Sequence, residues 1–135
     1  MKVLEHRIRY HEVDKQGFLF NSRYFEIADV GMTEFFRLLG WDYDHLIESG
    51  VDPSVVNINA DFFASAKFDD LLDVDVTCTK VGTKSFTLQT NIWRGEMKLA
   101  LMEIIYANVN LATEKAIPLT EQVAIKLRSF VERPE

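Results

Sequence analysis

Hydrophobic and polar residues follow two different periods along this chain, and the longest helical pattern lies near its start. Apolar residues recur at three- and four-residue steps, which predicts a long helix beginning near Asn21 and ending before Gly40. The stripe consists of Tyr24, Ile27, Ala28, Gly31, Phe35 and Leu38. Further apolar positions widen it, so we expect the helix to be covered on most sides. Gly31 costs about 1 kcal/mol relative to alanine inside a helix, which predicts that another backbone passes close by.

Alternation with a period of two predicts one strand before this helix and four strands after it. The predicted strands cover residues 3–10, 55–66, 72–79, 85–92 and 99–111. The last of them is apolar at nearly every position, so we expect it to be central and covered on both faces. Two short helices are expected at 41–49 and 119–130.

Short turns join the later strands, which favours antiparallel pairing between neighbours in the sequence. The early helix is the one element able to fill the concave side of so long a sheet. We therefore expect a single α+β domain over residues 1–135, with a curved antiparallel sheet wrapped around one long central helix. One sheet face and the open strand edges stay bare in this arrangement, so an oligomer is expected to cover them.

The amino-acid composition of the chain limits the kinds of partner that it can bind. The 135 residues are 47% hydrophobic and carry a net charge of -6, which argues against a nucleic-acid partner but leaves room for a small anionic ligand at a local basic cluster. The single Cys78 falls on the apolar side of a strand, as expected of a buried residue in a reducing, cytoplasmic compartment. No run is long enough for a membrane span, and no motif indicates a metal or a nucleotide cofactor.

Candidate chemistry is concentrated just before the long helix. Asp14 followed three residues later by Gly17 is typical of an ordinary type I turn, which explains both residues without a function. A helix begins next, and its first N–H groups and positive dipole end favour a negative charge. Asn21 or Ser22 is expected to cap this helix, a role compatible with a catalytic one.

Three segments resemble the hot-dog-fold acyl-CoA thioesterases of the 4-hydroxybenzoyl-CoA thioesterase type and their Tol-Pal-associated bacterial relatives. They read YHEVDKQG at 10–17, FNSRY at 20–24 and DFFASAKFDDLL at 61–72. The resemblance implies a hot-dog fold, an acyl-CoA substrate cleaved without a cofactor, and a homodimer or homotetramer with its sites at subunit interfaces. It departs at Asn21, where the Tol-Pal-associated enzymes carry His, at Asp29, where they carry Glu, and at 65–67, where Ser-Ala-Lys replaces Pro-Ala-Arg.

The same resemblance implies roles for individual residues. Asp14 is implied as the catalytic carboxylate, and the backbone N–H near Asn21 as the group that polarises the thioester carbonyl. Asp29 is expected to support the reaction from the helix, although an acid in the first turns of a helix is favoured anyway. Lys84 and Lys67 are the expected contacts to the CoA phosphates, against the alternative of ordinary solvated lysines. The expected substrate pocket contains Gly17, Tyr24, Phe62 and Ser65.

Thioester hydrolysis needs few groups, because a thiol with a pKa of about 8.5 leaves far more easily than an alkoxide. Asp14 either attacks the carbonyl to form an acyl-aspartate or deprotonates a water, and the sequence leaves both routes open. Two other functions remain alternatives: a non-catalytic binder of acyl or aromatic thioesters, and a proton-transfer isomerase using Asp14 as its base. The acyl group and the choice between dimer and tetramer are not encoded in any motif.

Overall fold

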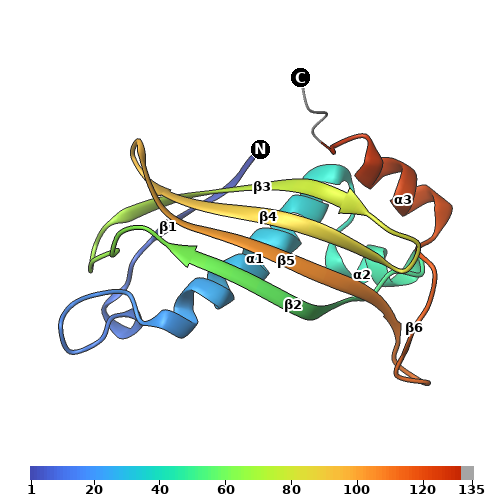
Figure 1. Cartoon of the computed structure of the whole chain (residues 1–135), viewed down its shortest axis with the longest axis horizontal. Coiled ribbons are helices and arrows are strands. Elements are labelled where there is room, and N and C mark those ends of the chain that lie inside the picture. The colour runs from blue at the N-terminus through green and yellow to red at the C-terminus, as the bar shows by residue number, and fades with distance from the viewer. Residues whose placement is uncertain (132–135) are drawn as a thin grey trace.

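The computed structural model describes residues 1–131, which form one antiparallel sheet curled around a long helix (Figure 1). The elements are β1 (Lys2–Arg7), the 3-10 turn η1 (Tyr10–Glu12), α1 (Asn21–Leu39), α2 (Tyr43–Glu48), β2 (Pro53–Phe62), β3 (Leu71–Val81), β4 (Ser85–Arg94), β5 (Met97–Asn110), β6 (Lys115–Ala116) and α3 (Glu121–Arg128). The expected α+β hot-dog architecture is confirmed. Within the described residues, no helix is both long enough and apolar enough to cross a membrane.

The strands are ordered β1-β3-β4-β5-β2, with β6 added to β5. Antiparallel pairing of sequence neighbours is right for β3, β4 and β5 but wrong for β2 and β3, because β2 pairs with β5 at the far edge. Residues 63–70 therefore cross the end of the sheet, where the N–H groups of Phe63 and Ala64 donate to the Leu99 carbonyl. β5 is central as predicted, but its outward face is not covered, since Glu103 is exposed there.

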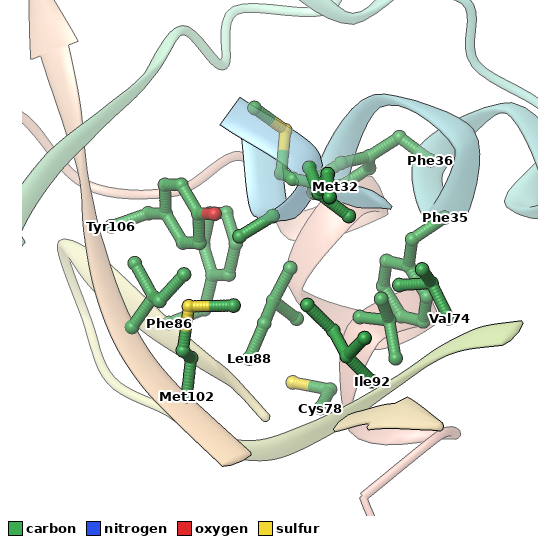
Figure 2. Packing of buried hydrophobic residues seen from close by; sticks show 14 of the residues in the cluster. Met32, Phe35, Phe36, Val74, Cys78, Phe86, Leu88, Ile92, Met102 and Tyr106 are labelled. Atoms are coloured by element: carbon green, nitrogen blue, oxygen red, sulfur yellow. The ribbon is translucent and has the colours of Figure 1, made fainter. Parts of the chain in front are cut away.

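Helix α1 packs one face against the concave side of the sheet (Figure 2). Its buried residues are Tyr24, Ile27, Ala28, Gly31, Met32, Phe35, Phe36 and Leu39. The expected cover on most sides is wrong for the single chain, because Val30 and Leu38 are about half exposed and Leu39 takes the buried place predicted for Leu38. At Gly31 the close neighbours are side chains rather than a backbone, since a Cβ built there would lie 3.4 Å from Val76 Cγ2.

Strand β1 is shorter than predicted. Its ladder with β3 ends at Arg7, the Ile8 N–H donates to the Asp70 carbonyl, and the chain then turns through η1. Tyr10, predicted inside the strand, is left 83% exposed. The predicted burial of Cys78 is confirmed, and burial raises the pKa of its thiol to about 11.

Candidate active site

A pocket of about 340 Å³ opens where α1 begins and β2 ends. It is lined by Asp14, Phe18, Leu19, Asn21, Tyr24, Phe62, Phe63, Ala64 and Ser65. The predicted residues that meet in this lining are Asp14, Asn21, Tyr24, Phe62 and Ser65. Gly17 belongs to the adjoining turn, whereas Asp29, Lys67 and Lys84 lie outside the lining.

Asp14 builds the turn that precedes the helix. Its Oδ1 accepts hydrogen bonds from the N–H groups of Gln16 at 2.8 Å and Phe18 at 3.2 Å, and its carbonyl accepts from Gly17 N–H at 2.9 Å. Gly17 has φ +84°, a conformation that glycine adopts without strain. Among residues 1–131, Oδ2 has no hydrogen-bond partner, so one carboxylate oxygen of this pocket-lining residue is fixed and the other is not.

Helix α1 begins without a side-chain cap. The N-cap residue is Phe20, whose side chain cannot accept a hydrogen bond, so the predicted capping by Asn21 or Ser22 is wrong. The position of Phe20 is fixed by its own N–H, which donates to the Glu12 carbonyl at 3.0 Å. The first-turn N–H groups therefore present an uncapped positive helix end beside Asp14.

Tyr24 packs the floor of the pocket. It is buried, and its ring meets that of Phe62 edge to face with centroids 4.9 Å apart. Burial raises the pKa of Tyr24, while a hydrogen bond from the Ala66 backbone and the charge of Arg94 oppose the rise. Phe62 and Phe63 are about half exposed, so the pocket of the single chain is open beside β2.

Asp29 lies about 12 Å along the helix from Asn21, counting 1.5 Å per residue, which is beyond the second turn. Burial raises its pKa, and the neighbouring Glu26 adds to the rise. Burial, followed by the charge of Asp29, raises the pKa of the Tyr106 hydroxyl. That buried hydroxyl has no hydrogen-bond partner among the described residues. Asp29 is exposed in the single chain and lies outside the pocket lining.

The two predicted lysines lie at opposite ends of the sheet. Lys67 belongs to the segment 63–70 beside the pocket, where it forms a backbone bridge with Phe18. Lys84 lies in the turn between β3 and β4, at the end of the sheet where β2 starts. The length of β2 separates that end from the pocket, about 30 Å for ten residues at 3.3 Å per residue. A single chain therefore does not bring Lys84 to the pocket.

A hydrogen-bonded pair that the sequence did not predict, His6 and Glu12, supports the chain just before the Asp14 turn. His6 Nε2 lies 2.9 Å from both carboxylate oxygens of Glu12, and the Arg9 N–H donates to Glu12 Oε1 at 2.7 Å. Burial alone would raise the pKa of Glu12, but these hydrogen bonds hold it below its usual value. His6 showed no partner pattern in the sequence, because the contact joins a strand to a turn at a spacing with no fixed period.

A second missed pair joins Asp70 to Arg94, whose nitrogen Nη1 lies 2.9 Å from Asp70 Oδ2. The sequence offered no signal for this contact, because it depends on the unexpected crossover of residues 63–70. Within residues 1–131, no group of three or more His, Cys, Asp or Glu side chains is placed to hold a metal ion.

Comparisons with known proteins also indicate a thioesterase. The family model of the thioesterase superfamily matches residues 16–101. The acyl-CoA thioesterase YbgC of Haemophilus influenzae is 26% identical over 118 residues, covering 87% of each chain. Among solved structures, a hypothetical protein, TT1821, of Thermus thermophilus aligns with TM-score 0.87 and 21% identity over 96% of this chain and 99% of that one. BH1999, a gentisyl-coenzyme A thioesterase, aligns with TM-score 0.84 and 19% identity over 92% and 97%.

The family match spans more than half of the chain, and it includes the start of α1 and the crossover segment beside the pocket. The resemblance drawn from the sequence segments at 10–17, 20–24 and 61–72 is therefore confirmed for the thioesterase superfamily, and the 4-hydroxybenzoyl-CoA type stays a prediction. The chain belongs to the thioesterase superfamily, shares its hot-dog fold, and is a thioester hydrolase.

Proposed function

We propose that this enzyme hydrolyses acyl-CoA thioesters in the pocket at the start of α1, with Asp14 as the catalytic carboxylate. The observation that carries the proposal is the meeting of two groups in one lining: a carboxylate with one free oxygen and an uncapped helix start. Asn21 contributes its backbone N–H, because the first helical N–H groups point out of the helix toward a bound carbonyl oxygen.

The reaction follows from these two groups. The helix N–H groups stabilise the negative charge that develops on the carbonyl oxygen. In one route Oδ2 of Asp14 attacks the carbonyl carbon, the C–S bond breaks, CoA leaves as thiolate, and water then cleaves the acyl-aspartate anhydride. In the other, Asp14 removes a proton from the water that attacks. Trapped acyl-Asp14, detected by mass spectrometry after rapid quenching, would select the first route.

The substrate class rests on the relatives and on the lining. The relatives reported above are named for CoA esters with an acyl or a gentisyl group. Tyr24, Phe62 and Phe63 give this pocket aromatic walls, which suit an apolar or aromatic acyl group. We therefore place the acyl group against these rings, with its thioester beside Asp14.

We further propose that the active unit is a homodimer, or a homotetramer built from such dimers, that pairs through β2. β2 ends the sheet, so its outer edge carries unpaired backbone groups, and Val56 on it is 59% exposed. A two-fold axis beside β2 would place the start of the partner's β2 next to Phe62. The partner's Lys84 turn would then lie at the pocket end of the sheet, where with Lys67 it would bind the CoA phosphates. The same pairing would cover Asp29. The cytoplasmic location expected from Cys78 stays a prediction.

The test is CoA release across a panel of acyl-CoA esters, detected with a thiol-trapping reagent. We expect the wild type to release CoA and Asp14→Asn to lose at least about 100-fold in kcat, because the nucleophile or base is removed. Circular dichroism should show an unchanged fold. Asp44→Asn is the matched control, since Asp44 is an exposed acid of α2 outside the pocket.

Binding of acyl-CoA without thiol release by the wild type would instead support a non-catalytic binder. A full rate in Asp14→Asn would overturn the assignment of Asp14. A lowered rate in the Asp44→Asn control would show that loss of any carboxylate harms the enzyme, and would remove the support for Asp14.

A further inference from the structure

We propose that Arg94 is a positioning residue that holds Asp14 in place through the crossover segment, residues 63–70. This inference rests on the proposed function, since it concerns the same site. Arg94 ends β4 and does not line the pocket, so it acts through other residues. The chain of contacts has two links.

The first link joins Arg94 to the crossover segment. Arg94 Nη1 donates to Asp70 Oδ2 at 2.9 Å and to the Ser65 carbonyl at 3.2 Å, so it joins the last residue of the segment to a residue near its start. Asp70 Oδ2 also accepts the Lys67 N–H at 2.9 Å. Arg94 therefore closes the segment into a loop whose ends cannot separate without breaking charge-assisted hydrogen bonds.

The second link joins the crossover segment to the arm that carries Asp14. The Leu19 N–H donates to the Ala66 carbonyl at 2.9 Å, and the Phe68 N–H donates to the Gly17 carbonyl at 3.1 Å. Ala66 is fully buried between them. Gly17 closes the Asp14 turn, so a shift of the crossover segment moves the catalytic carboxylate directly.

The Asp70–Arg94 ion pair is charged at neutral pH and can therefore hold the crossover segment in place. Burial alone would raise the pKa of Asp70, but the Lys67 N–H and Arg94 hold it below its usual value, so the carboxylate stays charged near neutral pH. The guanidinium contacts three acceptors at once, because its Nη2 also lies 3.5 Å from Met97 Sδ. The lysine nitrogen lies one bond nearer the backbone than Nη1, so it cannot reach both Asp70 and the Ser65 carbonyl from the same backbone position.

The experiment compares Arg94→Ala, Arg94→Lys and the matched control Arg37→Ala, which removes an exposed arginine of α1 that pairs with Glu34 on the same helix. We expect kcat to fall about tenfold or more in both Arg94 variants while KM changes less than about threefold, because a small displacement of a catalytic group costs rate rather than binding. Added guanidinium should restore part of kcat in Arg94→Ala, whereas Asp70→Asn should not respond.

Amide hydrogen exchange supplies a readout that does not depend on turnover. In Arg94→Ala the Leu19 and Phe68 amides should exchange faster, while amides of α3 should keep their wild-type rates. Unchanged exchange at these two amides, an unchanged kcat, or a kcat loss that guanidinium does not relieve would each overturn the inference. A wild type without thioesterase activity but with the expected exchange pattern would refute the proposed function and leave the positioning of the Asp14 turn supported.

Discussion

At the scale of single residues, Asp14 combines a structural and a chemical role because its two oxygens have different surroundings. Oδ1 holds the turn through two backbone N–H groups, which explains why the sequence looks like an ordinary type I turn. Oδ2 accepts no hydrogen bond from residues 1–131, and Asp14 lines the pocket. The structural explanation of Asp14 and the catalytic one are therefore parts of the same arrangement.

Glu12 gives a prediction at this scale. Replacing it with Gln leaves His6 and the Arg9 N–H without a charged acceptor in a site that is only 7% exposed. We expect the free energy of unfolding at pH 7 to fall by about 1–3 kcal/mol, as for other buried charged hydrogen bonds. Urea unfolding of the two proteins measures the difference.

The pH dependence of that difference has a definite sign. The folded-state pKa of Glu12 lies below its ordinary value of 4.5, so the stabilisation by its charged form is complete above about pH 4.5 and is lost as the pH falls through the folded-state pKa. The difference in the free energy of unfolding between wild type and Glu12→Gln should therefore become smaller as the pH falls below about 4.5. A gap that is constant from pH 7 to pH 3.5 would contradict this account.

At the scale of elements, Gly31 shows what close packing of α1 requires. A Cβ at this position meets Val76 Cγ2 at 3.4 Å and Val74 Cγ1 at 3.6 Å, which is ordinary contact. Gly31→Ala should therefore raise the free energy of unfolding by up to about 1 kcal/mol through helix propensity. Gly31→Leu should lower it by about 1–3 kcal/mol through overpacking. Thermal and urea unfolding would measure both changes in the free energy of unfolding. A destabilised Gly31→Ala variant would mean that even these contact distances strain the packing of α1 against β3.

The elements also show where sequence reasoning reached its limit. The period of each segment identified α1 and five of the strands, because periodicity reports which side of an element is buried. It carried no information on which strand edges meet. β2 is separated from β3 by a short segment and still pairs with β5, and that crossover brings Arg94 to Asp70. The Asp14 turn was predictable as a local motif, whereas its two supporting ion pairs were not.

At the scale of the whole molecule, the single chain does not bring all the residues proposed for the site together. The pocket is open beside β2, and Lys84 lies at the other end of the sheet. In the proposed dimer each site combines Asp14 from one chain with Lys84 from its partner. The contact between Lys84 and the CoA phosphates should affect KM only for substrates that carry the CoA nucleotide.

This shared site makes a prediction for mixed dimers. Lys84→Gln alone should raise KM for acyl-CoA about threefold to tenfold, the loss expected for one charged contact, and should leave KM for the N-acetylcysteamine thioester unchanged. Asp14→Asn alone should be inactive. Refolding the two variants together creates dimers in which one site has both Asp14 and Lys84, so activity with the wild-type KM should appear.

A second experiment adds Val56→Lys to both chains, which places a charge on the exposed edge of β2. The matched control is Leu38→Lys, which places a charge on a comparably exposed position of α1. Val56→Lys should give a monomer in analytical ultracentrifugation and abolish the recovery, and Leu38→Lys should do neither. If the mixture shows only the raised KM of Lys84→Gln, Lys84 of one chain does not serve the Asp14 site of its partner. Because the single chain separates Lys84 from the pocket by the length of β2, that outcome would exclude the proposed β2 interface as the source of the CoA site.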